Sequence, residues 1–575
     1  MCTRPSRATG WRGNKNTHKH KEEHYEKDPC NDPGAGAQPQ PAGCGSTKSD
    51  DAAADGQSGS RPSIVRFSAD STPKIDPAVI NDLVGSICVE NLYDGLVLQD
   101  GSEQVPNLAT DWTVSEDGLS YTFHLKQGVK FHSGNEMKAS DVVFSFDRFK
   151  TIGEGFAYLF ANVATCTADD DYTVTFTLSQ SMGSFMGIIW HLYVLDEATV
   201  MANIAADGTY GDKGDYGKAW LLENDAGSGP YTATEMVHSE YFLASRFADW
   251  HMGWEGRENA PEQFKAIYMT EPSTQQTMMA NQQLEISSPW FAPENYEALD
   301  AIDGVDLAFT SWACTQYVFF NTTMAPTDDA NYRKALSCLL DYESFLGPCF
   351  YGASLSVGPV SSSIAGHNDN CTTYKYDLEQ AKKYLAQSKY ADTYQSIELD
   401  CFLLDAAPAL EKMMLSLQAS CAQVGITMNI RKGPWLTYQE QISSPDTTPN
   451  VSTCNITPSV NDAASVLRTL FGSSTQGTFE NPTWVANAEL DAKLDAAVAM
   501  TDTDERNAVA SELQDYIMKD LCPSAPVGDL AAPYAYQSTY IDWPVANYYK
   551  ETGELKYYAL GMDMYMPDIS VYTDR

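Results

Sequence analysis

The sequence lacks an apolar run long enough to cross a bilayer. A transmembrane helix needs about 20 mainly apolar residues. The nearest approach, residues 182–195 (MGSFMGIIWHLYVL), is shorter and is interrupted by His191. We therefore expect no membrane-spanning segment, and we interpret residues 182–195 as a buried part of a folded domain.

Basic residues are also scarce. The 575 residues include 37 Lys and Arg against 77 Asp and Glu, which gives a formal net charge of −40. Such a chain repels the phosphates of nucleic acids, so we expect no nucleic-acid partner. It is equally unsuited to electrostatic adhesion to an anionic membrane. An acidic balance of this size is typical of a soluble, exported protein.

Motifs that would indicate an enzyme or a bound cofactor are missing. The sequence contains no G-x-S-x-G, no H-E-x-x-H, no phosphate-binding glycine loop and no dinucleotide fingerprint. The histidines after residue 60 are not at metal-ligand spacing, and we expect hydrogen-bonded or surface roles for His124 and His132. The 77 carboxylates are too numerous for any pair to be singled out as acid and base. We expect no enzyme, no cofactor and no metal site.

The cysteines include no C-x-x-C pair. Ten of the 13 lie beyond residue 44, widely spaced along the chain. An even set of this kind favours disulfides in an oxidising compartment, with Cys401–Cys421 and Cys349–Cys371 as plausible local pairs. The alternative is that they are reduced residues of the core.

The N-terminal region lacks an apolar segment, since residues 1–43 contain no Leu, Ile, Val or Phe. Nevertheless Ala42-Gly43-Cys44 resembles the end of a bacterial lipoprotein signal, in which Cys44 would be lipidated, and residues 45–60 read as a polar tether. Codons for residues 38–41 shifted by one base can encode Ser-Leu-Ser-Leu. We expect the residues before about Ala42 to reflect a frameshift or a misassigned start; the alternative is a genuine disordered leader with an incidental cysteine.

Beyond residue 60, strand patterns alternate with helix patterns. Residues 63–70 alternate as a strand, and residues 119–131 predict a hairpin or two short strands turning at Gln127-Gly128. Helices are predicted after Ser140 as N-cap, over residues 378–389 and 408–424, and as a pair within residues 487–521. Residues 426–432 read as a strand. This alternation indicates an α/β protein.

Several long blocks then resemble one family in a fixed order. Residues 106–148 read PNLATDWTVSEDGLSYTFHLKQGVKFHSGNEMKASDVVFSFDR and follow NLYDGL at residues 91–96. Later come GSGPYTATEMVHSEYFLASRFADW at residues 227–250 and YVFFNTTMAPTDDANYRKALSCLLD at residues 317–341. These blocks resemble the family 5 extracellular solute-binding proteins, the peptide, nickel and oligopeptide receptors of ABC importers. The resemblance covers about residues 63–575.

The resemblance implies a two-lobed, periplasmic-binding-protein-like α/β fold of type II, with two crossing hinge strands. Lobe I would comprise residues 61–310 and a C-terminal return over 525–575, lobe II would comprise residues 311–524, and residues 1–60 would be the leader and tether. It also implies a monomer that captures a peptide or small polar solute between the lobes and delivers it to ABC permease subunits. The protein would be lipid-anchored outside the cytoplasmic membrane or periplasmic. Alternatives are a pheromone or nutrient sensor on this fold, or a secreted hydrolase.

The ligand contacts can be narrowed by the same resemblance. Peptide-binding members hold the ligand ammonium with an Asp in a W-x-x-D-Y-x-D-P segment, which resembles residues 455–471, NITPSVNDAASVLRTLF. Ser459 then stands in place of that Asp, and a neutral Ser forms no charge-assisted bond to an ammonium. This implies a blocked, modified or non-peptidic ligand, or a contact from Asp462 instead. The candidate ligand-binding residues, with Trp290 favoured among the aromatics, are Tyr93, Tyr158, Trp290, Trp312, Tyr317, Trp435, Ser459 and Asp462.

Overall fold

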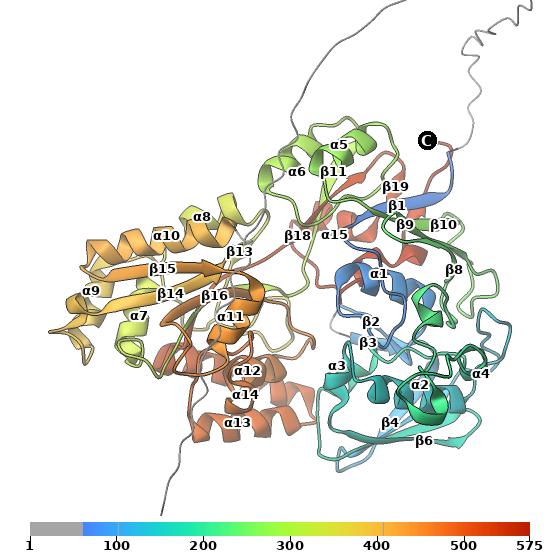
Figure 1. Ribbon diagram of the computed structural model, residues 1–575, viewed down its shortest axis with the longest axis horizontal. Coiled ribbons are helices and arrows are strands. Elements are labelled where there is room, and N and C mark those ends of the chain that lie inside the picture. The colour runs from blue at the N-terminus through green and yellow to red at the C-terminus, as the bar shows by residue number, and fades with distance from the viewer. Residues whose placement is uncertain (1–60, 102, 406–407) are drawn as a thin grey trace, which may run out of the picture. The chain divides into compact units, whose positions relative to one another are not determined.

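The computed structural model describes residues 61–101, 103–405 and 408–575 (Figure 1). Cys44 and the tether over residues 45–60 lie outside the described residues. Within the described ranges, no helix has both the length and the apolar character needed to cross a membrane.

We call the residues before 311 and after 531 lobe I. They form the first group of sheets. One four-stranded sheet has the order β1-β10-β9-β8, with β1 parallel to β10, and an antiparallel pair joins β11 to β18. A second four-stranded sheet, β4-β5-β7-β6, is antiparallel throughout. The strand bounds are β1 Ile64–Ala69, β2 Val97–Asp100, β3 Glu103–Pro106, β4 Ala109–Val114, β5 Ser120–Leu125, β6 Val163–Asp170, β7 Thr173–Leu178, β8 Tyr231–Val237, β9 Tyr241–Arg246, β10 Gln263–Tyr268, β11 Val305–Thr310, β18 Ala532–Gln537, β19 Ile541–Asp542 and β20 Ser570–Val571.

The helices of lobe I pack on these sheets through apolar faces. In the longest of them, α2, the buried side chains include Val142, Phe146 and Phe149, which recur at helical spacing. The helix ends at Gly153, whose φ of 67° is readily adopted only by glycine. The helix bounds are α1 Leu83–Leu92, α2 Ala139–Ile152, α3 Met186–Ile189, α4 Glu197–Ala202, α5 Pro272–Ala280, α6 Pro293–Asp300 and α15 Pro544–Thr552.

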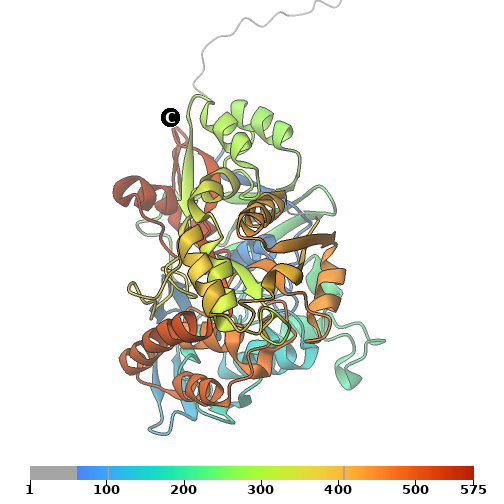
Figure 2. The ribbon, with the colours of Figure 1, turned by 90° about the vertical axis from the view of Figure 1, so that its left-hand side faces the viewer.

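Residues 315–529 form lobe II around one six-stranded mixed sheet, with the order β13-β17-β12-β16-β14-β15. Every residue of β12 is buried, because Val318 and Phe320 enter one core cluster while Tyr317 and Phe319 enter another. Figure 1 shows α10 on one side of this sheet and α12 to α14 on the other, and Figure 2 shows the same yellow and orange-red groups from the side. The bounds are β12 Thr315–Phe320, α7 Ala330–Cys338, α8 Tyr342–Cys349, β13 Ser354–Leu355, α9 Leu378–Gln387, β14 Glu398–Leu404, α10 Pro408–Gln423, β15 Thr427–Gly433, α11 Trp435–Ile442, β16 Val451–Ile456, α12 Ala463–Phe471, α13 Ala488–Ala499, α14 Thr503–Tyr516 and β17 Ser524–Asp529.

The chain passes between the lobes twice, once between β11 and β12 and once between β17 and β18. The two crossing segments are joined where the Leu530 amide donates to the Cys314 carbonyl at 2.8 Å. Beside them, the buried carboxylate of Asp529 accepts hydrogen bonds from Thr315 and from the amide and hydroxyl of Ser362. These two short crossings, tied to each other, form the connection expected of a two-lobed binding protein.

Most of the predicted elements are present, but residues 119–131 differ from the prediction. Only β5 forms there, and it pairs with β4 and β7 rather than with residues after Gly128. The turn at Gly128 exists, with φ of 75°, but it leads to an isolated bridge between Lys130 and Glu136. The predicted hairpin is therefore wrong. The N-cap of α2 is Lys138 rather than Ser140.

The disulfide prediction is also wrong. All ten cysteines that the structure describes are free, and all but Cys349 are buried. Cys401 and Cys421, one of the pairs predicted to be bridged, both lie in the lobe II core. Burial raises the pKa of Cys421 to about 12, so its thiol stays protonated and packs as a small apolar group. These residues match the alternative of reduced core cysteines.

Candidate functional site

The two lobes meet along a rim of short polar contacts. The Gly183 amide donates to the Val498 carbonyl and the Ser181 hydroxyl donates to the Ala499 carbonyl, both at 2.9 Å. The Ser465 hydroxyl reaches that of Ser184 at 3.2 Å. The approach is close, since a Cβ at Gly183 would lie 1.7 Å from the carbonyl oxygen of Met500. This contact therefore requires glycine on the lobe I side.

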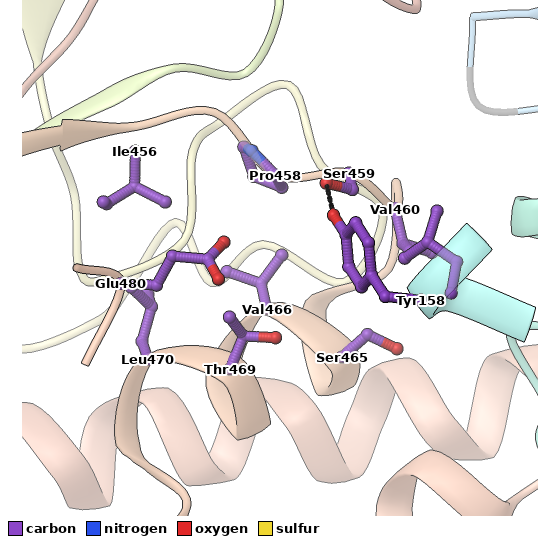
Figure 3. A pocket seen from close by; sticks show the side chains of 11 residues that line it. Tyr158, Ile456, Pro458, Ser459, Val460, Ser465, Val466, Thr469, Leu470 and Glu480 are labelled. Atoms are coloured by element: carbon purple, nitrogen blue, oxygen red, sulfur yellow. Dashed lines mark hydrogen bonds between the residues drawn. The ribbon is translucent and has the colours of Figure 1, made fainter. Parts of the chain in front are cut away.

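Two of the predicted site residues meet directly across the lobes. Tyr158 projects from lobe I with 60% of its surface exposed. Its hydroxyl is 2.7 Å from the hydroxyl of Ser459, which lies 301 positions later in the loop between β16 and α12 (Figure 3). Each hydroxyl can donate or accept a hydrogen bond, so each can bond to a polar group of a ligand in place of the other.

A histidine fixes the backbone of the same loop. His191 Nε2 lies 3.3 Å from the Ser459 carbonyl, and the His191 ring stacks on Trp190. Burial lowers the pKa of His191 to about 3, although its hydrogen bond to Ser459 acts in the opposite direction. The imidazole is therefore neutral near pH 7, and its Nε2–H donates to the carbonyl. It positions Ser459 without bringing charge to the site.

Two adjoining cavities lie at this interface. The smaller, of about 60 Å³, is the one in Figure 3, and the larger measures about 610 Å³. The larger volume falls in the range of small-molecule sites, which is roughly 300–1,000 Å³. Tyr158 and Leu159 of lobe I face lobe II residues in both cavities. The residues that line both are Tyr158, Leu159, Val460, Ser465, Thr469 and Glu480.

Asp462 has a structural position. It is 4% exposed and caps α12, accepting hydrogen bonds from the amide and hydroxyl of Ser465. Its other oxygen accepts from Arg506 Nε at 2.7 Å. A carboxylate with these partners is already neutralised by the guanidinium. It is poorly placed to replace the missing ammonium-binding Asp.

The remaining predicted residues lie away from these two cavities. Trp290 is 58% exposed and its ring centroid is 5.4 Å from that of Trp312, whose indole donates to Asp563 beside the crossing segments. Tyr317 is buried in β12 and its hydroxyl donates to the Pro359 carbonyl. Tyr93 is buried against Tyr193 in the lobe I core, and Trp435, at the start of α11, packs on Phe479. The structure thus brings together Tyr158 and Ser459, with Asp462 supporting the loop that carries Ser459.

Sequence reasoning missed the charged residues that line the cavities: Glu480 and, in the larger cavity, also Arg468 and Asp495, which form an ion pair with each other. Glu480 lines both cavities, in the loop between α12 and α13. It is one of 77 acidic residues, and no motif around it distinguishes it from the others. Only its position in the fold singles it out. Among the residues that the structure describes, no group of three or more His, Cys, Asp or Glu side chains is arranged to hold a metal ion.

An α/β protein of two lobes, crossed twice by the chain and holding a cavity between them, defines the class of bilobed solute-binding proteins. The family model described as bacterial extracellular solute-binding proteins, family 5 Middle, matches residues 103–478, more than half of the chain. The protein belongs to this family, as the sequence blocks predicted.

The chain is similar to known proteins over most of its length. Heme-binding protein A of Haemophilus influenzae is 25% identical over 489 residues, covering 78% of this chain and 86% of that protein. The probable D,D-dipeptide-binding periplasmic protein DdpA of Escherichia coli is 24% identical over 475 residues, covering 81% and 86%. The structure of the ABC transporter-associated periplasmic binding protein DppA of Helicobacter pylori, in complex with the peptide STSA, superposes with a TM-score of 0.68 at 22% identity, covering 89% and 99%. This last similarity shows the fold.

Proposed function

We propose that this protein is the substrate-binding component of an ABC importer, and that it captures peptides or related small polar solutes between its lobes. The observation that carries the proposal is the pair of cavities that Tyr158 of lobe I forms with lobe II residues, the smaller of them lined by Ser459, in a chain of this family. The similar proteins DdpA, a probable D,D-dipeptide-binding protein, and DppA, seen in complex with the peptide STSA, support peptides as the ligand class. We propose a monomer that hands its ligand to membrane permease subunits and has no catalytic activity.

The boundaries of the lobes belong to the same proposal. β17 pairs with β12 in the six-stranded sheet, which supports extending lobe II to Asp529 instead of ending it at 524. Lobe I then returns at β18. We further propose that Cys44 carries a lipid anchor on the outer face of the cytoplasmic membrane, with the residues before it absent from the mature protein.

Mass spectrometry under native conditions, applied to protein purified from its own cells, tests the proposed ligand class. We expect a bound peptide or amine-bearing solute of a few hundred daltons, which fits about 610 Å³. Adding the recovered compound to ligand-free protein should raise the melting temperature, because it binds the folded state alone. A heme group as the bound species would contradict the proposal, as would peptide hydrolysis during incubation.

A further inference from the structure

We infer that Glu480 binds a cationic ammonium group of the ligand. It would supply the negative charge that Ser459, a neutral residue, lacks. Figure 3 shows the Glu480 carboxylate directed into the space beneath Pro458, in the same cavity as Ser459. This inference rests on the proposed function and specifies the chemistry of its ligand.

The charge of Glu480 is not compensated within the described residues. Its carboxylate makes no hydrogen bond or ion pair with any of them, in contrast to Asp462 and its partner Arg506. Burial raises the pKa of Glu480, and no described basic group acts in the opposite direction. An isolated carboxylate in a partly dry cavity is unfavourable unless a cation joins it. The cavity is therefore suited to a positively charged group.

The other residues that line the small cavity carry no charge, while Arg468 in the larger cavity is paired with Asp495. The Tyr158 side chain lines the same small cavity as Glu480, and its hydroxyl is 2.7 Å from that of Ser459. Ser459 and Thr469 add hydroxyl oxygens to the same small cavity. An ammonium group has three donors and needs several oxygen acceptors, and a carboxylate with two or three hydroxyls provides them. The volume of about 60 Å³ accommodates such a group with a water molecule.

The loop that carries Glu480 is firmly held. The Phe479 ring packs on Trp435, and the Asn481 side chain, which is fully buried, donates to the Gly472 carbonyl at 2.8 Å. The Trp484 indole donates to the Thr448 hydroxyl at 2.8 Å. With both sequence neighbours anchored, the Glu480 backbone has a fixed position. A preorganised carboxylate of this kind binds a cation without first being ordered.

Three random tripeptide libraries distinguish the possible sources of the ammonium. One has free N-termini and no Lys or Arg, the second is the same library acetylated at the N-terminus, and the third is acetylated with one Lys per peptide. Calorimetry should show that the wild type prefers the first or the third library to the second by about 10- to 100-fold. Preference for the first assigns the α-ammonium, and preference for the third assigns a side chain.

The Glu480→Gln variant should lose that preference while keeping its fold. Its melting temperature without ligand should be unchanged or higher, because a half-buried charge without a partner has been removed, whereas a merely structural role would lower it. Adding Ser459→Asp to Glu480→Gln should restore the preference. Glu489→Gln, on the exposed surface of α13 and paired with Lys493, serves as the control and should bind as the wild type does.

The outcomes separate the two proposals. If the wild type binds peptides but binds the acetylated library without Lys equally well, Glu480 does not recognise an ammonium and the proposed function stands. An unchanged preference in Glu480→Gln overturns the inference in the same way. If the wild type binds none of the three libraries, peptide capture is refuted, and the inference that depends on it is refuted with it.

Discussion

Breaking the buried ion pair between Arg148 and Asp76 is predicted to destabilise lobe I far more than breaking an exposed ion pair would. Arg148, on α2, donates from Nη1 and Nη2 to the two Asp76 oxygens at 2.7 and 2.6 Å. Both side chains are 1% exposed, and Arg148 Nε also donates to the Tyr216 carbonyl. Asp76→Asn leaves the guanidinium buried opposite a neutral amide. Removing one partner of such a pair costs about 3–5 kcal/mol.

A second bidentate pair has the same two distances, through Nε and Nη2 of Arg431, but is exposed. Arg431 donates to the two oxygens of Asp400 at 2.7 and 2.6 Å, while 45% and 38% of the two side chains are exposed. Solvent screens this pair, so Asp400→Asn should cost at most about 1 kcal/mol. Asp249→Asn, which breaks an exposed pair with Lys130 inside lobe I, controls for the lobe.

Urea unfolding followed by tryptophan fluorescence measures the three variants. We expect Asp76→Asn to lower the free energy of unfolding by about 3 kcal/mol or more, and each control by no more than about 1 kcal/mol. Adding Arg148→Met to Asp76→Asn should recover part of the loss, because the unpaired charge is then gone. Equal losses in Asp76→Asn and Asp400→Asn would refute the argument that burial, rather than pairing geometry, sets the cost.

Two further predictions concern closure and pH. Gly183→Ala should open the lobes and weaken ligand binding, seen as a larger radius of gyration in solution scattering, while Gly347→Ala, whose added Cβ has no neighbour within 4 Å, should have neither effect. Burial lowers the pKa of His132, but the charge of Asp225 and hydrogen bonds to Asp225 and a backbone carbonyl outweigh this and raise it. The stabilisation is complete below about pH 6.5 and is lost as pH rises through the raised pKa, so His132→Gln should cost most near pH 6 and less at pH 9. A cost that stays constant over this range would contradict the assignment, and His238→Gln, with 60% of the side chain exposed, should cost little throughout.

The helices that local patterns predicted are present, since their signals lie within the segments themselves, although many other helices were not predicted. For α10, Pro408 at the start and Gly425 after the end, with φ of 86°, mark the limits that the structure shows. The strand partners of β5 were not predictable in this way. Its pairing with β7, some 50 residues later, depends on the long-range fold, whereas the turn signal at Gly128 favoured a local hairpin.

The residues of the candidate site could be predicted from the sequence only in part. The family resemblance singled out Ser459 as the residue in place of the ammonium-binding Asp, and Tyr158 was chosen as an aromatic that could contact ligand; the structure brings their hydroxyls to within 2.7 Å of each other. Glu480 could not be found, because what distinguishes it from other acidic residues is its place in both cavities without an ion-pair partner, which depends on the fold. The disulfide prediction failed for a related reason. The number and spacing of the cysteines are compatible with bridges, and only the three-dimensional structure shows that the described cysteines are free.

The nature of the contacts between the lobes suggests how the ligand controls the protein. The hydrogen bonds across the rim come from backbone amides, small hydroxyls and Tyr158, which water can replace when the lobes separate. Each contributes only about 0.5–1.5 kcal/mol net. Shifting an equilibrium from mostly open to mostly closed takes about 5.5 kcal/mol of differential binding. A ligand that fills the larger cavity and neutralises Glu480 provides contacts that exist only when both lobes surround it. Closure therefore reports that the cleft is occupied, which is the property an importer needs from its receptor.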